Sequence, residues 1–144
     1  MDIFSIRAPN SDSEYNDYIN FRWSTLRKPL GMSKESTVDE REHNSHHLIG
    51  LINKDIVACG RLHFNTNKQA QIRYMSVDQS IKRRGYGSKI LYELERLAKL
   101  NNAEEIILNA REAVKEFYLV NGYVEIAPFK SVTGITHTTM NKLL

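Results

Sequence analysis

The densest cluster of positive charge in the sequence stands beside two glycines in the stretch "KRRGYGS", at residues 82–88. The residues before it, "IRYMSV", are typical of a strand, and those after it, "KILYELERLAKL", are typical of a helix. A helix N-terminus presents backbone N–H groups without intrahelical partners, and glycines let an anion approach them without meeting a Cβ. With Lys82, Arg83 and Arg84 beside these groups, the turn is suited to binding phosphate.

The spacing of the glycines excludes two common nucleotide-binding loops. A Walker loop requires G-x-x-x-x-G-K-[ST], which this turn lacks. The dinucleotide fingerprint G-x-G-x-x-G requires a third glycine at the position where this chain has Ile90. The residues alone therefore leave two interpretations: a turn that binds phosphate, or an ordinary strand-to-helix turn with solvated cations.

Two stretches resemble the signature motifs of the GNAT acetyltransferases. "VDQSIKRRGYGSKIL" is similar to the acyl-CoA-binding motif of that family, [Q/R]-x-x-G-x-[G/A] between a strand and a helix, with Gly85 and Gly87 at the two small positions and Lys82 in place of Gln or Arg. "LNAREAVKEFYLVNGYVE" resembles the second signature, a strand and a short helix that end in F-Y-x-x-x-G-[FY]. The segments "LRKPLG", "HHLIG", "GRLHF" and "GITHTTMNK" further resemble the ElaA-like bacterial branch.

The resemblance implies how acetyl-CoA would bind. Backbone N–H groups at residues 84–88 would hold its pyrophosphate, and the neighbouring cations would help to hold the 3′-phosphate. The pantetheine arm would lie in a splay between the strands "YMSV" and "IILNA" and pair with exposed backbone. The candidate cofactor-binding residues are Met75, Val77, Lys82, Arg83, Arg84, Gly85, Tyr86, Gly87, Ser88, Asn109 and Arg111.

The resemblance also implies an activity, acetyl-CoA-dependent N-acetylation of a primary amine on a small molecule or a peptide. Tyr118 matches the tyrosine that protonates the departing thiolate, and the N–H of Val77 or Met75 would stabilise the tetrahedral oxyanion. Adjacent helical residues point about 100° apart, so we expect Phe117 to pack in the core and Tyr118 to face the cleft. Two alternatives are a basic nucleic-acid-binding module and a non-catalytic acyl-CoA-binding protein of the same fold.

The sequence does not identify the general base. The strand before the glycine turn, "QAQIRYMSV", has no glutamate, and His47, His63 and His137 are candidates because an unperturbed histidine titrates near neutral pH. Deprotonation through a water relay is an equal alternative. His43, His46 and His47 are close in sequence, but no cysteine or acidic residue completes a zinc pattern, so we expect no metal site.

Two further features are expected to be structural. Cys59 lies in the apolar run "IVACG" and should be a small core residue. Asp39, Glu40 and Glu42 lie in a polar segment near the expected acceptor side, where we expect an exposed acidic loop. Attraction of a cationic amine by these carboxylates is the alternative.

The elements that must position these residues follow from hydrophobic periodicity and from turn residues. Helical spacing predicts one helix that carries Tyr15 to Leu26, one at Gly85–Leu100 and a shorter one at residues 111–122. Residues 32–45 are expected to form a loop with room for one short helix. The apolar strand at residues 106–110 should be buried on both faces. The other predicted strands are residues 3–7, 46–52, 56–64, 69–77, 123–129 and 135–143, with three antiparallel neighbours from 46 to 77 and a final pair joined near Gly134.

Composition is compatible with one domain over residues 1–144. The chain is 41% hydrophobic and 26% charged, and its formal net charge is +3, far from the charge of a dedicated nucleic-acid-binding protein. The single cysteine excludes an internal disulfide, and no apolar run approaches a membrane span. We therefore expect a cytoplasmic α/β (α+β) domain of GNAT type, with a mixed, mostly antiparallel central sheet flanked by helices. We expect no membrane or specific nucleic-acid partner, and a homodimer is compatible with the sequence.

Overall fold

A seven-stranded sheet forms the centre of the protein in a computed structural model that describes residues 3–144. The strands follow the order β1-β2-β3-β4-β5-β7-β6, and all neighbours are antiparallel except β4 and β5, which are parallel. This mixed, mostly antiparallel sheet confirms the expected fold class. The strands are β1 (Phe4–Arg7), β2 (His46–Ile52), β3 (Asp55–Phe64), β4 (Gln69–Val77), β5 (Glu105–Arg111), β6 (Val124–Lys130) and β7 (Thr136–Leu143).

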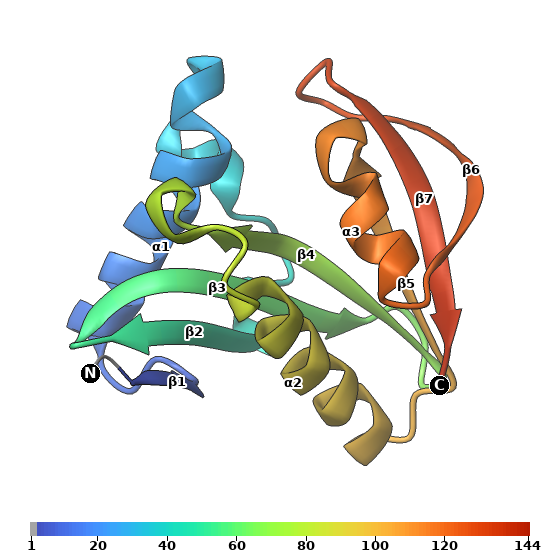
Figure 1. Cartoon of the computed structure of the whole chain (residues 1–144), viewed down its shortest axis with the longest axis horizontal. Coiled ribbons are helices and arrows are strands. Elements are labelled where there is room, and N and C mark those ends of the chain that lie inside the picture. Colours follow the sequence, from blue (N-terminus) through green and yellow to red (C-terminus); the bar gives the residue numbers. More distant parts are fainter. Residues whose placement is uncertain (1–2) are drawn as a thin grey trace.

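Helices cover both faces of the sheet (Figure 1). On one face, Ile90 and Leu94 of α2 pack with Leu62 of β3 in the larger hydrophobic core. On the other face, Tyr18 of α1 packs with Cys59 of β3, which is fully buried as expected. The α-helices are α1 (Asp12–Leu26), α2 (Tyr86–Leu100) and α3 (Lys115–Val120), and the 3-10 turns are η1 (Lys28–Leu30), η2 (Lys34–Thr37), η3 (Glu42–Asn44), η4 (Gln79–Ile81) and η5 (Glu112–Val114).

Residues 32–45 form a loop with short helical segments, as expected, and these are the two 3-10 turns η2 and η3. Two sequence expectations for these elements need correction. The segment predicted as one helix at residues 111–122 is divided, because β5 continues to Arg111 and η5 precedes the six-residue α3. β5 is not buried on both faces: alternate residues are only half-buried, because α1 packs on β3 and β4 and leaves that face of β5 uncovered.

A β-bulge in β4 separates this strand from β5. Opposite the single residue Gly60 of β3, β4 carries two residues, Tyr74 and Met75, and Tyr74 has the left-handed φ of 56°. Bulges bend the strand that carries the extra residue. Pairing between β4 and β5 accordingly ends at Ile72 and Leu108, and the remainder of the two strands forms the expected splay.

Gly60 sets how closely α2 approaches the sheet. A Cβ at this position would lie 2.8 Å from Cδ1 of Leu94 and 3.0 Å from Cγ2 of Ile90. The missing side chain therefore lets α2 pack directly on β3 beside the bulge. As a result, the N-terminus of α2 is fixed close to the end of β4 (Figure 1).

Candidate active site

The glycine turn (residues 82–88) forms the N-terminus of α2, and Gly85 is the residue before the first helical position. Gly85 has a φ of +82°, and a Cβ there would meet no atom within 4 Å, so the backbone faces open space. Within residues 3–144, no backbone N–H group from Arg83 to Ser88 donates a hydrogen bond. Free N–H groups at a helix N-terminus favour a bound anion.

The cations of the glycine turn are also available to a ligand. Lys82, Arg83 and Arg84 are exposed, and none of them forms an ion pair with the described part of the chain. A turn with an open glycine, unpartnered N–H groups and three free cations fits the pyrophosphate and 3′-phosphate of a CoA molecule.

The splay presents backbone groups of β4 that β5 does not use. The N–H of Asp78 donates to the carbonyl of Val57 on β3 at 2.8 Å. Successive N–H groups of a strand point to opposite edges, so the N–H of Val77 and that of Met75 point into the splay. Both residues thus have the position that the sequence analysis expected for contact with an extended acyl arm.

Tyr118 lies beside the same edge of β4, in the core between α3 and the sheet. The residue is only 7% exposed, and its hydroxyl donates to Sδ of Met75 at 3.8 Å, its single hydrogen bond within residues 3–144. A thioether is a weak acceptor, so the hydroxyl is still able to serve a better one. Burial raises the pKa of Tyr118 above its usual value, which keeps the phenol protonated.

The relative burial of Phe117 and Tyr118 is the reverse of the expected one. Phe117 is only partly buried and lies against the glycine turn, 3.4 Å from where a Cβ of Gly87 would be. Tyr118 packs edge-on against Phe117 and Tyr123, with ring centres 5.0 and 5.7 Å away. The short α3 therefore inserts Tyr118 between Met75 and the core.

Asn109 and Arg111, expected to contact the acyl arm, both have partners on the α1 side of the sheet. Oδ1 of Asn109 accepts a hydrogen bond from the Thr139 hydroxyl of β7 at 2.6 Å. Nη2 of Arg111 donates to the carbonyl of Leu26, at the end of α1, at 2.7 Å. Arg111 therefore bridges the splay from β5 to α1.

The acidic segment is not an exposed loop, contrary to expectation. Its carboxylates Asp39 and Glu42 form a buried ion network with two arginines whose side chains are fully buried, Arg22 of α1 and Arg61 of β3. Arg22 donates to Glu42 at 2.8 Å, and Arg61 donates to Asp39 at 2.7 Å and to Glu42 at 2.6 Å. Only Glu40 of the three acidic residues is exposed.

Arginine partners decide the protonation of this ion network. Burial acts to raise the pKa of Asp39, but hydrogen bonds from Arg61 and from the backbone of Arg41 lower it to about 2. Burial acts in the same way on Glu42, and the hydrogen bond from Arg22 again lowers the pKa. These carboxylates are charged and matched at neutral pH, so they do not attract a substrate amine.

The sequence analysis missed the arginines of this network. Arg22 follows Tyr18 by four residues and Ile19 by three, so it occupies the buried stripe of α1 at a position that an apolar residue would normally fill. An arginine on the apolar stripe was the sequence signal that could have indicated a buried ion pair. The left-handed Tyr74 gave none, because a tyrosine rarely adopts this conformation.

Among the three candidate bases, only His137 has a free ring nitrogen. Nε2 of His47 donates to the carbonyl of Glu42 and its Nδ1 accepts from Tyr18, while both ring nitrogens of His63 are also hydrogen-bonded. Nδ1 of His137 donates to the carbonyl of Ile135 at 2.7 Å, and its Nε2 has no partner within residues 3–144. A neutral imidazole protonated at Nδ1 accepts a proton at Nε2.

His137 also lies on the same face of the sheet as Arg111, the face on which α1 packs. It is the direct cross-strand partner of Arg111, and such partners project their side chains on the same face of a sheet.

No group of three or more potential metal-ligating side chains occurs in the part of the chain that the structure describes. Likewise, no helix formed by residues 3–144 is long and apolar enough to cross a membrane.

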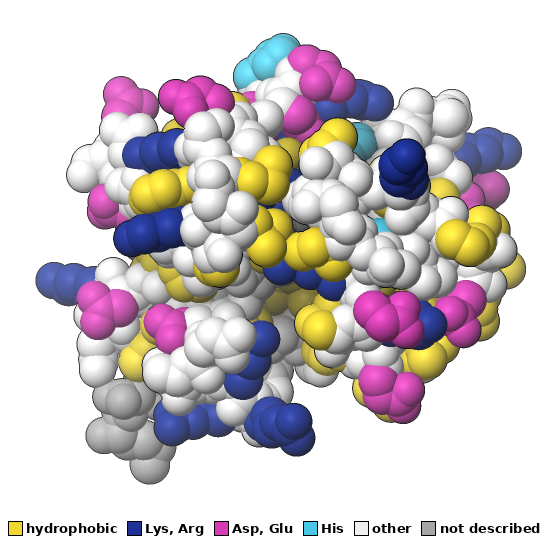
Figure 2. Space-filling model, turned by 90° about the horizontal axis from the view of Figure 1, so that it is seen from above, with side chains coloured by type: hydrophobic (Ala, Val, Ile, Leu, Met, Phe, Trp, Pro, Cys, Tyr) yellow, Lys and Arg dark blue, Asp and Glu magenta, His cyan; other side chains and the backbone are white. Residues whose placement is uncertain are grey.

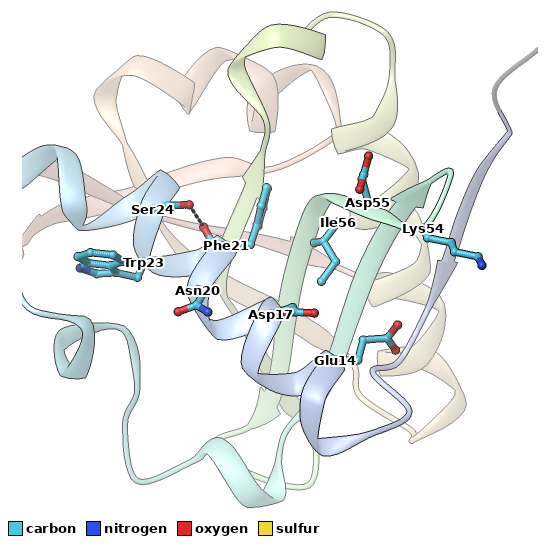
Figure 3. A pocket seen from close by; sticks show the side chains of 9 residues that line it. All are labelled: Glu14, Asp17, Asn20, Phe21, Trp23, Ser24, Lys54, Asp55 and Ile56. Carbon is cyan, nitrogen blue, oxygen red and sulfur yellow. Dashed lines mark hydrogen bonds between the residues drawn. The ribbon is translucent and has the colours of Figure 1, made fainter.

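Two shallow pockets lie elsewhere. One, of about 450 Å³, is formed by α1 and the start of β3, where side chains such as Asp17, Trp23 and Asp55 surround it (Figure 3). The other, of about 690 Å³, lies between the start of α1 and β2 and includes His46 and His47. Neither includes a residue of the glycine turn or of the splay, so neither is part of the candidate site.

Comparisons with known proteins identify the family and the fold of the chain. Residues 6–123 match the Acetyltransferase (GNAT) family. The chain is 26% identical over 133 residues to a Bacillus subtilis protein named as the uncharacterized N-acetyltransferase YjcF, and the match covers 92% of this chain and 94% of that protein.

Solved structures show the same fold. Escherichia coli ElaA superposes with a TM-score of 0.81 at 15% identity, over 99% of both chains, which agrees in fold with the expected similarity to ElaA. An aminoglycoside 6′-N-acetyltransferase complexed with coenzyme A superposes with a TM-score of 0.78 at 14% identity, over 98% of this chain and 96% of that one. Together with the sequence match over most of its length, this shows that the chain is a member of the GNAT acetyltransferase family.

Proposed function

We propose that the protein transfers an acetyl group from acetyl-CoA to a primary amine. The observation that carries the proposal is the run of unpartnered backbone N–H groups at Arg83–Ser88, which follows directly on the strand edge left free by the splay. A cofactor with a pyrophosphate and an extended amide-containing arm matches both features. The CoA complex of the structurally similar aminoglycoside acetyltransferase supports the same cofactor.

Each end of the site has a separate task in binding. The N–H groups of Gly85, Tyr86, Gly87 and Ser88 would hold the pyrophosphate, with the side chains of the neighbouring cations around it. The backbone of Met75 and Val77 would hold the arm in the splay. Acetyl-CoA supplies the acetyl thioester, and the protein supplies orientation, which alone accounts for much of the acceleration in two-substrate reactions.

Two protons must move during the transfer. The substrate nitrogen forms a bond to the acetyl carbon as the carbon–sulfur bond breaks, so the nitrogen loses a proton and the sulfur gains one. Tyr118 would donate a proton to the sulfur, and the weak thioether contact of its hydroxyl, the single hydrogen bond of that group within residues 3–144, supports this role. Nε2 of His137 is the available acceptor for the proton of the amine.

The proposal is tested by cofactor binding and by turnover. Millimolar acetyl-CoA and CoA should raise the melting temperature by mass action, and AMP should do so much less. A panel of primary amines should then release free thiol from acetyl-CoA. Absence of a shift with acetyl-CoA contradicts the proposal, and a shift without thiol release from any amine indicates the non-catalytic acyl-CoA-binding alternative. Sub-micromolar oligonucleotide binding at physiological salt would favour the nucleic-acid-binding module.

A further inference from the structure

Arg27, the residue after α1, is a buried residue whose guanidinium has only a ring contact with Tyr74, and no acidic partner, within the described residues. The residue is only 7% exposed, and its side chain makes no hydrogen bond and no ion pair within residues 3–144. Its Nε is completely buried, whereas Nη1 and Nη2 are partly exposed to solvent. Removing an arginine from water without a compensating partner is costly, so this position favours a bound anion.

Other arginines lie close to Arg27 and increase the cost. Cζ of Arg27 is 5.8 Å from the ring centre of Tyr74, and Cζ of Arg73 is 4.5 Å from the same ring. Nη2 of Arg111 donates to the carbonyl of Leu26, the residue that precedes Arg27. Burial lowers the pKa of Arg27, and the charges of Arg111 and Arg73 lower it further.

No carboxylate compensates the pair formed by Arg27 and Arg111. Arg73 donates to Asp39 at 2.8 Å, but Asp39 is shared with Arg61. Neither Arg27 nor Arg111 has an acidic partner within the described residues. Figure 2 shows Lys and Arg side chains at the bottom of a depression between the half of the molecule with α1 and the half with α3.

The cofactor phosphates are not the expected partner of this pair. The glycine turn begins α2, on one face of the sheet, whereas Arg111 reaches to the end of α1, on the other face. The pair instead borders the splay on the face on which α1 packs, because Arg111 lies beyond the last pair of β4 and β5, Ile72 with Leu108, and reaches the end of α1. With the cofactor phosphates on the other face, this side is left for the second substrate. An anion held here would lie on the second substrate.

We propose that Arg27 and Arg111 bind an oxyanion of the acceptor, so that the acceptor is a small primary amine that also carries a carboxylate or phosphate group. This inference rests on the proposed function. The planar guanidinium forks present parallel N–H donors that match both oxyanions. The amine of the same molecule would then be directed to the acetyl group in the splay.

The first experiment compares acceptors that differ only in the anion. L-Amino acids are assayed against their amides, and O-phosphoethanolamine against ethanolamine, with acetyl-CoA at saturation. We expect kcat/KM to be at least about tenfold higher for the anionic member of the preferred pair, equivalent to about 1.4 kcal/mol. The carboxylate raises the pKa of the neighbouring amine and so disfavours its reactive form, which makes such a preference a property of the site.

The two pairs also distinguish carboxylate from phosphate. Equal turnover of neutral and anionic acceptors overturns this inference and leaves the proposed function intact. The same compounds are added to protein saturated with CoA and followed by melting temperature, which requires no turnover. If no thiol is released, a shift confined to anionic compounds still supports the arginine site, and the absence of any shift overturns it.

The second experiment removes the arginine charges. Arg27→Gln and Arg111→Gln should each lower kcat/KM for the anionic acceptor by at least about tenfold, mainly through KM, and reduce its preference over the neutral analogue. Arg96→Gln is the matched control, since Arg96 is exposed on α2 and pairs only with Glu93. An unchanged preference in both variants overturns the inference. Should Arg27→Gln fail to fold, Arg111→Gln is decisive because Arg111 has a single carbonyl contact.

Discussion

The ion network between α1 and the sheet and the splay beside it are both rich in arginine, but they differ in how those arginines are matched. In the ion network, Arg22 and Arg61 bind Asp39 and Glu42. At the splay, Arg27 has no acidic partner and no side-chain hydrogen bond within residues 3–144. Arg22 and Arg27 nevertheless lie near the same ring, since their Cζ atoms are 3.9 and 5.8 Å from the centre of Tyr74.

The difference separates structural charge from charge available to a ligand. In the ion network the guanidinium ends are matched by carboxylates, even though Nε of Arg22 and of Arg61 has no hydrogen-bond partner within residues 3–144. A buried cation matched by carboxylates is an internal feature of the fold, whereas one without an acidic partner favours an anion supplied from outside. The same distinction applies at the glycine turn, where N–H groups and cations lack partners. Substitutions in the ion network should therefore reduce stability, and substitutions at the splay should reduce binding or turnover.

The largest effect is expected in the ion network. Glu42→Gln removes a charge that contacts both Arg22 and Arg61; Arg61 keeps Asp39, but the fully buried Arg22 loses its carboxylate partner. We expect the free energy of unfolding at pH 7 to fall by about 3–5 kcal/mol. Urea unfolding measures the change.

Two variants test the specificity of that loss. Glu14→Gln breaks the more exposed ion pair with Arg7 and should lower the free energy of unfolding much less, because exposed ion pairs contribute little to stability. Arg27→Gln should not destabilise the protein, because it removes a charge that has no acidic partner within residues 3–144. A loss for Arg27→Gln as large as that for Glu42→Gln would contradict the comparison.

At the glycine turn, Gly85→Glu should abolish most CoA binding. The new carboxylate would stand in open space at the helix N-terminus and repel a pyrophosphate, and each lost hydrogen bond to a charged group costs about 1.5–3 kcal/mol. We expect affinity to fall on the order of 10²-fold, measured by calorimetry.

Gly134→Glu is the matched control for this variant. Gly134 has a φ of +77° and, like Gly85, no atom within 4 Å of a built Cβ. The backbone strain and added charge are therefore similar, but the residue lies in the turn between β6 and β7. Equal losses of CoA affinity in both variants would show that the glycine turn is not the pyrophosphate site.

The sequence was sufficient for the features that depend on local pattern. Period-two alternation and turn residues located the strands, and the two glycines with their neighbouring cations located the N-terminus of α2. It was not sufficient for features created by contacts between distant segments. The local sequence predicts a solvated loop at Asp39, because its partner Arg61 lies 22 residues later in the chain. The bulge at Tyr74 depends on the same tertiary packing, since stacking with Arg22 accompanies its left-handed backbone.

Two buried tyrosines extend the comparison to neutral groups. The hydroxyl of Tyr18 donates to Nδ1 of His47 at 2.8 Å and accepts from Arg22 at 3.2 Å, whereas that of Tyr118 meets only Sδ of Met75. Tyr118→Phe should lower kcat on the order of 10²-fold, which is the lower end of the range for general acid catalysis. The effect is at that end because burial raises the phenol pKa, so proton donation to a thiolate with a pKa near 8.5 is uphill.

The free energy of unfolding should be affected more by Tyr18→Phe than by Tyr118→Phe. Tyr18→Phe leaves Nδ1 of His47 without its donor and removes one of the two acceptors of Arg22 Nη1, so it should cost about 1–3 kcal/mol. Tyr118→Phe should leave the free energy of unfolding nearly unchanged. Steady-state kinetics and urea unfolding on both variants separate the two roles. Normal turnover by folded Tyr118→Phe would end its assignment as a proton donor.

The smallest expected effect is the acid sensitivity of the ion network. The pKa of Asp39 is about 2 in the folded protein, below the value near 3.9 of an unfolded chain. The unfolded state therefore binds the proton first, so this stabilisation is present above about pH 4 and is lost as the pH falls towards 2. Glu14, with a pKa of about 2, adds to the same slope. Asp39→Asn should reduce the dependence of unfolding free energy on pH in this window without abolishing it. A solvated Asp39 would leave the slope unchanged.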